Sequence, residues 1–184
     1  MTQNKDERLL EKIRSEEYVN QADFFDPSIL TFTDDVRGMC EQNSCGKYNK
    51  AWNCPPACGT IEELEAECRK YKKGILVNSV SQIEDSFDWE GMMEGGQRMS
   101  GLLIDIYGYT KSFGIDDYRV FSGGGCKGCD ECSYPDEPCR HPDTLFIPIE
   151  ACGINVMSLA KKAGFNYING QNTVTFFGMV LYND

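Results

Sequence analysis

Apolar side chains recur at helical spacing in four parts of the chain, near residues 6–18, 61–73, 99–113 and 155–163. A capping box formed by Thr60 and Glu63 marks the start of the second predicted helix. Short apolar runs predict strands at residues 29–32, 75–80, 117–122, 165–168 and 173–182. Asn169-Gly170 separates the last two runs and predicts a tight hairpin. The pattern therefore predicts an α+β (or α/β) fold with a single sheet and flanking helices.

Two stretches have no periodicity and predict ordered loops, residues 40–58 and residues 123–142. They contain all but two of the ten cysteines. A length of 184 residues suits one domain with its own core, so the fold should not need metal to exist. We expect a single domain, residues 1–184, with both cysteine loops at one edge of the sheet.

The second loop has three cysteines at three-residue spacing, Cys126, Cys129 and Cys132, followed by Cys139. This spacing lets a loop curl around an iron–sulfur cube and present thiolates to three irons, as in bacterial ferredoxins. Cys139 either completes the same cluster or ligates another one. Zinc is the alternative metal, although zinc sites usually draw two close pairs of cysteines from separate segments.

The first loop has four cysteines at a spacing that no familiar cluster motif shares: Cys40, Cys45, Cys54 and Cys58. A radical-SAM motif would need a further cysteine at position 61, where the chain has Ile61. The two loops together supply enough thiolates for two [4Fe-4S] clusters. Trp52, inside the first loop, either shields a cluster from water or belongs to the core.

Three further residues have open roles. Cys68 shares an apolar helix face with Leu64 and is interpreted as a core residue. Cys152 precedes the last predicted helix, where it either packs in the core or is a reactive thiol of lowered pKa. His141 is the only histidine and either ligates a cluster, donates a hydrogen bond to a cluster sulfur, or organises the loop.

Known catalytic motifs are missing from the sequence. Gly123, Gly125 and Gly128 formally match a dinucleotide-binding fingerprint, but no helix is predicted after them to hold a pyrophosphate. We expect these glycines instead to let backbone amides approach cluster sulfurs. No P-loop, HExxH motif or nucleophile elbow is present, and a single histidine disfavours a Ser/His/Asp triad.

Charge and hydropathy exclude several classes of partner. The formal net charge is −11 and the pI about 4.6, so the surface repels nucleic-acid backbones and favours encounter with a positively charged protein. No apolar run is long enough to predict a membrane span, and the first 17 residues have no apolar centre typical of a secretory signal. We expect a cytoplasmic protein, whose clustered thiols are metal ligands rather than disulfides.

The cysteine loops resemble one known family. The resemblance is carried by Cys40-x4-Cys45-Gly-Lys-Tyr48, Trp52-Asn-Cys54-Pro-Pro-x-Cys58-Gly, Gly125-Cys126-x2-Cys129-x2-Cys132-x-Tyr134, Cys139-Arg-His-Pro142, Glu150-Ala-x-Gly153-Ile and the segment from Thr173 to Gly178. The chain resembles the cysteine-rich "predicted metal-binding protein" family, a domain of unknown function in anaerobic bacteria and archaea. The resemblance implies metal binding by the eight loop cysteines, and no settled reaction.

Three functions fit these observations. The first is an iron–sulfur protein with two [4Fe-4S] clusters that transfers electrons to a redox partner protein, which is more an electron carrier or accessory protein than an enzyme. The second is a zinc-binding structural or partner-docking module. The third is a cluster-dependent enzyme with an open iron site, which would need a cluster held by three cysteines.

Overall fold

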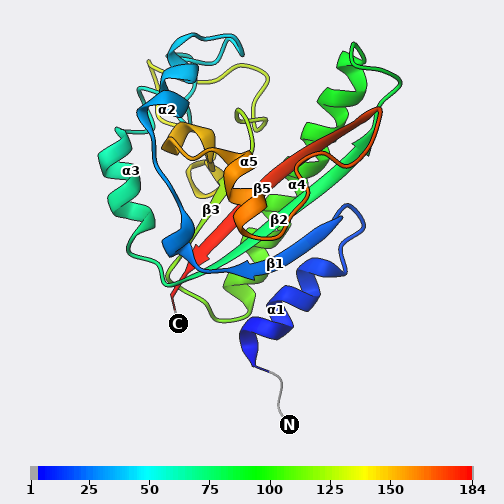
Figure 1. Ribbon diagram of the computed structural model, residues 1–184. Helices are drawn as coiled ribbons and strands as arrows, with labels where there is room; N and C mark the ends of the chain where they lie inside the picture. The colour runs from blue at the N-terminus through cyan, green and yellow to red at the C-terminus, as the bar shows by residue number, and fades with distance from the viewer. Residues whose placement is uncertain (1–3, 184) are drawn as a thin grey trace.

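A five-stranded mixed sheet forms the centre of the computed structural model, which describes residues 4–183 (Figure 1). The strands lie in the order β1-β2-β5-β3-β4, and their bounds are Gln21–Phe25 for β1, Lys73–Gln82 for β2, Tyr118–Ser122 for β3, Ile147–Pro148 for β4 and Thr173–Tyr182 for β5. Neighbours pair antiparallel, apart from the parallel β3 and β4. The long antiparallel pair of β2 and β5 therefore forms the central part of the sheet.

Helices cover both faces of this sheet. Their bounds are Lys5–Arg14 for α1, Asp34–Glu41 for α2, Ile61–Cys68 for α3, Trp89–Ser112 for α4 and Val156–Lys162 for α5, with short 3-10 turns at Pro27–Ile29 (η1), Pro142–Thr144 (η2) and Glu150–Cys152 (η3). Within residues 4–183, no helix combines the length and the apolar character that crossing a bilayer demands. The predicted α+β class, with a single sheet and flanking helices, is confirmed.

Alternation along the strands builds two separate cores. On β2, Ile75 and Val77 pack with α1 and α4, whereas Leu76 packs on the opposite face with α3 and α5. On β5, Val180 faces the first core and Met179 the second. A register slip of one residue would move each set to the wrong face, so burial on both sides fixes the register.

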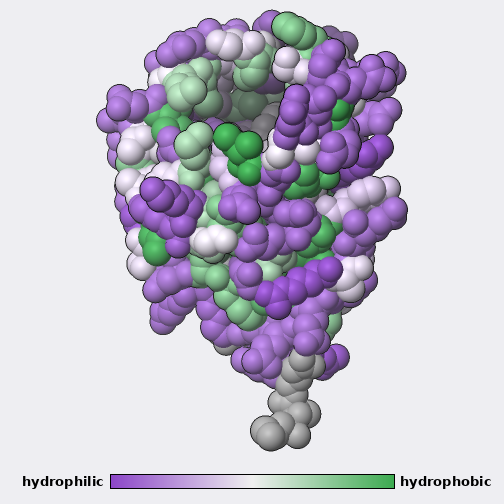
Figure 2. Space-filling view, turned by 45° about the vertical axis from the view of Figure 1, so that its right-hand side comes forward, coloured by the Kyte–Doolittle hydropathy of each residue, from purple (hydrophilic) through white to green (hydrophobic). Residues whose placement is uncertain are grey.

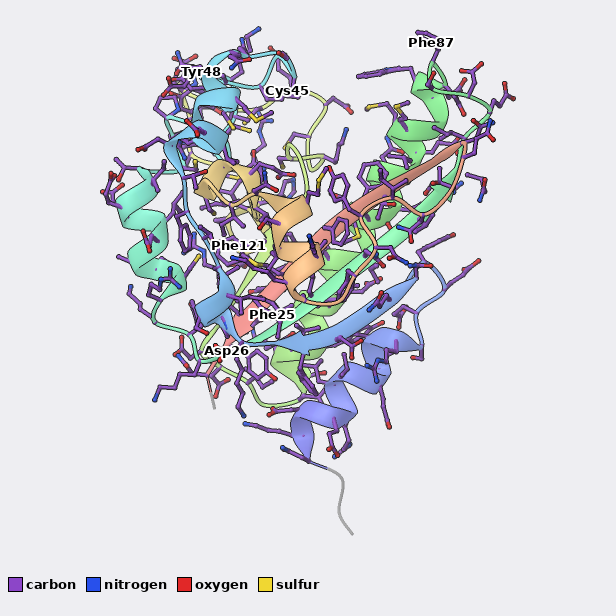
Figure 3. The ribbon with its side chains drawn as sticks, in the orientation of Figure 1. Phe25, Asp26, Cys45, Tyr48, Phe87 and Phe121 are labelled. Atoms are coloured by element: carbon purple, nitrogen blue, oxygen red, sulfur yellow. The ribbon has the colours of Figure 1, made fainter. Side chains whose placement is uncertain are left out.

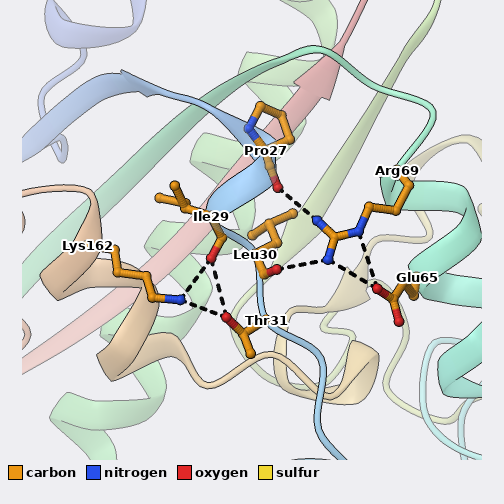
Figure 4. A network of polar contacts seen from close by, with 7 residues as sticks. All are labelled: Pro27, Ile29, Leu30, Thr31, Glu65, Arg69 and Lys162. Carbon is orange, nitrogen blue, oxygen red and sulfur yellow. Dashed lines mark hydrogen bonds and ion pairs between the residues drawn. The ribbon is translucent and has the colours of Figure 1, made fainter.

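Residues 29–32 do not form the strand that their apolar character predicts. The segment contains η1 and one isolated bridge between Phe32 and Ile154. Side chains take its carbonyls instead: Arg69 Nη2 donates to Leu30 O at 3.0 Å, and Lys162 Nζ donates to Ile29 O at 3.0 Å (Figure 4). Because α3 and α5 supply these donors, the segment is held between two helices and needs no partner strand.

The predicted hairpin at Asn169-Gly170 is also wrong. Residues 165–168 form no strand, and Asn169 Nδ2 donates to Thr175 Oγ1 at 2.9 Å to tie this segment to β5. The strands that pair with β5 are β2 and β3, and the edge of the sheet beside β2 is formed by β1, which the apolar pattern did not predict. The packed residues of β1, Ala22 and Phe25, are too few to produce a clear period in its five residues.

The helix α4 begins at Trp89, well before the predicted start at residue 99. Asp88 caps it by accepting a hydrogen bond from the Gly91 amide at 2.8 Å. Gly95 lies where the helix meets the sheet, and a Cβ atom there would be 2.8 Å from the ring of Phe176. Gly95, one of the glycines that obscure the helical pattern, is therefore part of the close packing of α4 on the sheet.

Candidate metal centre

The two cysteine loops contact each other at one end of the molecule (Figure 1), where Figure 3 places Cys45 and Tyr48. Trp52 of the first loop donates from Nε1 to Glu137 O of the second at 3.0 Å, and its ring meets Tyr134 edge-on at 4.9 Å. The Tyr134 hydroxyl donates to Asn49 Oδ1 at 2.7 Å. Trp52 is only partly buried, so its observed role is to join the two loops.

One buried side chain fixes this pair of loops to the sheet. Asn53 has 0% exposed surface, and its Nδ2 donates to Phe146 O at 3.0 Å, just before β4. The hydroxyl of Ser122, at the end of β3, donates to the same carbonyl at 3.2 Å. A buried carbonyl satisfied in this way holds Asn53, and with it the neighbouring Cys54, in one position.

The first cysteine set consists of Cys40, Cys45, Cys54 and Cys58. Cys40 lies in the last turn of α2, Cys45 is exposed, Cys54 is buried and Cys58 is half-buried. Burial, together with smaller contributions from the thiolates of Cys45, Cys58 and Cys40, raises the pKa of Cys54 to about 12. Burial also raises the pKa of Cys40, and the neighbouring thiolates of Cys45 and Cys58 add to this rise. The fold thus brings all four thiols close enough to influence each other's ionisation.

Arg37 is a functional residue that the sequence reasoning missed. It lies one turn before Cys40 on α2, and its Nη1 atom donates to Ala151 O and lies 3.7 Å from Cys58 Sγ. Its Nη2 atom donates to Gly59 O at 2.6 Å. The guanidinium lowers the pKa of Cys40 and Cys58, although burial outweighs it in both thiols. Arg37 therefore favours the thiolate form, which is the form that binds metal.

Glu150 is a second missed residue and has the opposite charge. Its Oε2 atom is buried and has no hydrogen-bond partner within residues 4–183. Burial raises the pKa of Glu150, and a hydrogen bond from the Gly124 amide partly offsets this rise. The carboxylate in turn raises the pKa of Cys40. Glu150 thus connects the first cysteine set with the start of the second loop.

All four cysteines of the second set line one cavity of about 420 Å³ between the two loops. His141 and first-loop residues such as Lys47 and Trp52 line it as well. Backbone amides already point at two of its sulfurs: Gly128 N donates to Cys126 Sγ and His141 N to Cys139 Sγ, both at 3.4 Å. Hydrogen bonds of this kind stabilise thiolates and tune iron–sulfur clusters. The expected role of the glycines therefore fits Gly128.

Gly123 has a different role from the one expected. A Cβ atom on Gly123 would lie 2.6 Å from Phe177 O, so this glycine lets the loop leave β3 close against β5. The match to a dinucleotide fingerprint has no structural counterpart, because residues 123–141 contain no helix.

Thiolate chemistry makes both sets fit soft metals, either zinc or iron–sulfur clusters. Within the part of the chain that the structure describes, however, no three histidine, cysteine, aspartate or glutamate side chains are arranged to hold one metal ion. Zinc bound by thiolates at about 2.3 Å would require sulfurs within roughly 4 Å of one another. The four thiols of the second set line a common cavity, and Cys40, Cys54 and Cys58 of the first set line none of the cavities described here.

Comparison with known protein families agrees with this arrangement. The family described as Predicted metal-binding protein (DUF2284) matches residues 23–182. The chain belongs to this family. The matched region contains both cysteine sets and the whole sheet except the first two residues of β1, and it leaves out α1. Searches of curated proteins and of solved structures found no match.

The two remaining cysteines of this family member lie outside both sets. Cys68 and Cys152 are each 0% exposed and belong to the core beneath α3 and α5. Their side chains contact each other. The hydrogen bond between them is the largest cause of the raised pKa of Cys152, and burial is the second. The predicted packing role fits both residues, and a reactive Cys152 of lowered pKa does not.

Proposed function

We propose that this protein binds two [4Fe-4S] clusters, one on each cysteine set, and transfers electrons to a partner protein in the cytoplasm. The first cluster would be held by Cys40, Cys45, Cys54 and Cys58, and the second by Cys126, Cys129, Cys132 and Cys139. When bound, such clusters supply one-electron redox chemistry.

The observation that carries this proposal is the open arrangement of the thiols. The four cysteines of the second set line a cavity of about 420 Å³ between the two loops, which is more room than a single ion needs. The two N–H···S contacts of Gly128 and His141 add the donors that cluster sulfurs accept. These features support an iron–sulfur cluster instead of zinc in the second set. The first set has the same number of thiols, so the proposal assigns a cluster to it as well.

Three features support electron transfer. The loops that carry the two sets contact each other through Trp52 and Tyr134, so two clusters would be neighbours. Cys45 is exposed, which would bring the first cluster close to the surface. The net charge of −11 favours rapid association with a basic partner surface.

Anaerobic reduction tests this redox function directly. Protein purified without oxygen should lose most of its absorption near 400 nm on stepwise reduction, and regain it when an oxidant is added. The midpoints of the two steps should fall within the range of about −700 to +450 mV that iron–sulfur proteins span. A colourless protein, or a coloured one that no reductant bleaches down to about −700 mV, would exclude the electron-transfer role.

A further inference from the structure

A second cavity, larger than the one in the second cysteine set, lies between α4, β5 and the start of the second loop. Its volume is about 580 Å³, within the range of about 300–1,000 Å³ that small-molecule sites occupy. Figure 2 shows a hollow at this end of the molecule, away from α1. We call this cavity the α4 cleft, and its apolar wall includes Met92, Met93, Met99, Phe146, Val174 and Phe176.

The α4 cleft touches both cysteine sets. Cys45 of the first set and Cys126 of the second line it, together with His141. A molecule in the cleft would therefore lie against a ligand of each proposed cluster. Methionine side chains are flexible and polarisable, so this wall can adapt to the shape of an apolar ligand.

The charges in the cleft differ from those of the whole chain. The protein has 29 acidic and 18 basic residues, yet no carboxylate is among the described residues that line the cleft. Its one lysine is Lys127, in the sequence between Cys126 and Gly128. The full charge that the described lining itself carries is therefore the positive charge of Lys127, which suits the charged group of an anionic ligand.

Lys127 reaches from the second loop across to α4. Its Cε atom would lie 3.8 Å from a Cβ atom built on Gly96, and its Nζ donates to Met93 Sδ at 3.5 Å. Within residues 4–183 this thioether sulfur is the partner of its ammonium group, and thioethers accept hydrogen bonds only weakly. The ammonium group is thus held over an apolar wall without a carboxylate to neutralise it.

We propose that the α4 cleft binds a small organic anion with an apolar body, whose charged group meets Lys127. The apolar body packs against Met99 and Phe176, and the charged group lies beside Cys126 and His141. This binding does not depend on which metal the cysteines hold, so it can fail or succeed separately from the iron–sulfur proposal.

Three matched naphthalenes test the proposal: the anion 2-naphthoate, the neutral 2-naphthamide and the cation 2-(aminomethyl)naphthalene. Each is titrated by calorimetry into the protein as purified without oxygen. Naphthoate should bind saturably and at least about tenfold more tightly than the amide, with the cation weakest. Saturation absent up to about 5 mM, or equal affinities for the three probes, would overturn the proposal.

Two variants and one control locate the site. Lys127→Met should abolish the preference for the anion, while Lys111→Met, which removes the same charge from the last turn of α4, should leave it intact. Gly96→Leu should exclude all three probes, because a Cβ atom there meets nothing closer than 3.5 Å and the side chain enters the cleft. Circular dichroism and metal content verify that each variant is folded and loaded. A preference for the anion that survives in Lys127→Met would assign the binding to another site.

Discussion

Two half-buried ionisable side chains of opposite charge type lie beside the first cysteine set. Arg37 donates hydrogen bonds to two backbone carbonyls and lies 3.7 Å from Cys58 Sγ, whereas Glu150 has one buried oxygen without a partner within residues 4–183. Arg37 favours the thiolate form of Cys40, whereas Glu150 disfavours it. Their balance should set both metal affinity and reduction potential at this set.

Replacing Arg37 should therefore lower the reduction potential of one cluster. A positive charge stabilises the reduced, more negative form, so in Arg37→Met one of the two reduction steps should move to lower potential by tens of millivolts. Arg98→Met, on the exposed surface of α4, is the control with the same change in charge. The measurement is an anaerobic redox titration followed by absorption. Identical steps in the variant and the wild type would show that Arg37 has only a structural role.

Glu150 should make the stability of the protein depend on pH. Its raised pKa means that the folded state keeps this proton at pH values where the unfolded state, with a pKa near 4.5, has lost it. Stability due to this group therefore falls as the pH rises above about 4.5, through the raised folded value.

The variant Glu150→Gln removes this ionisation but keeps the size of the side chain. Urea unfolding should show Glu150→Gln gaining stability over the wild type as the pH rises from about 4 to 8, and matching it at the acid end. The control is Glu90→Gln at an exposed position of α4. Parallel pH profiles for Glu150→Gln and the wild type would contradict the assignment.

At the scale of single residues, the sequence predicts the cysteines of the site better than it predicts the residues that surround them. The spacing of the cysteines predicts both sets, because ligands close in sequence share a loop, and their role as metal ligands stays a prediction. Arg37, Glu150 and Lys127 act through contacts with distant segments, such as Arg37 with Ala151 and Lys127 with Met93. Nothing in the local sequence reveals such contacts.

At the scale of elements, the packing of α4 on the sheet organises the molecule. Its glycines have unequal surroundings: a Cβ atom on Gly95 would lie 2.8 Å from Phe176 and Ser81, while one on Gly108 would meet nothing within 4 Å. Gly95 therefore allows close approach to β2 and β5, whereas Gly108 only weakens the helix.

Alanine at these two positions should change stability in opposite directions. Gly95→Ala should destabilise the protein by about 1–3 kcal/mol, because the added methyl overpacks the interface. Gly108→Ala should stabilise it by roughly 0.5–1 kcal/mol, because it improves helix propensity at an exposed position. Urea unfolding of both variants measures the difference. A neutral Gly95→Ala would mean that the helix and the sheet are more loosely packed than described.

The elements that the sequence predicted correctly have an apolar face that packs into one of the two cores. They are β3, β5, the central part of β2, the second half of α4, and the helices α1, α3 and α5. The errors concern segments whose partners are set by tertiary contacts. Residues 29–32 are apolar like a strand, but Arg69 and Lys162 satisfy their carbonyls from neighbouring helices.

At the scale of the whole molecule, the cysteine loops and the core are largely separate. Two hydrophobic cores cover the two faces of the sheet. Of the eight proposed ligands, Cys54 is buried and Cys58 packs against the edge of one core. A chain of 184 residues can support such cores without metal. The loops, in contrast, have few regular backbone hydrogen bonds and rely on Trp52, Asn53 and Tyr134.

Removing the metal should therefore loosen the loops and leave the sheet intact. After chelation under denaturant-free conditions, far-UV circular dichroism should keep most of its amplitude. Amide hydrogen exchange should become faster in residues 40–58 and 123–142, and stay slow in β2 and β5. Global unfolding on metal removal would show that the metal is needed for the fold itself.

Iron, zinc and acid-labile sulfide content, measured on protein purified without oxygen, tests the central claim most directly. Two [4Fe-4S] clusters predict about eight irons and eight sulfides per chain, with almost no zinc. Replacing Cys54 in the first set or Cys129 in the second with serine should each remove about half of both, while Cys68→Ser should remove neither. A colourless protein containing one or two zinc ions and no sulfide would contradict the account.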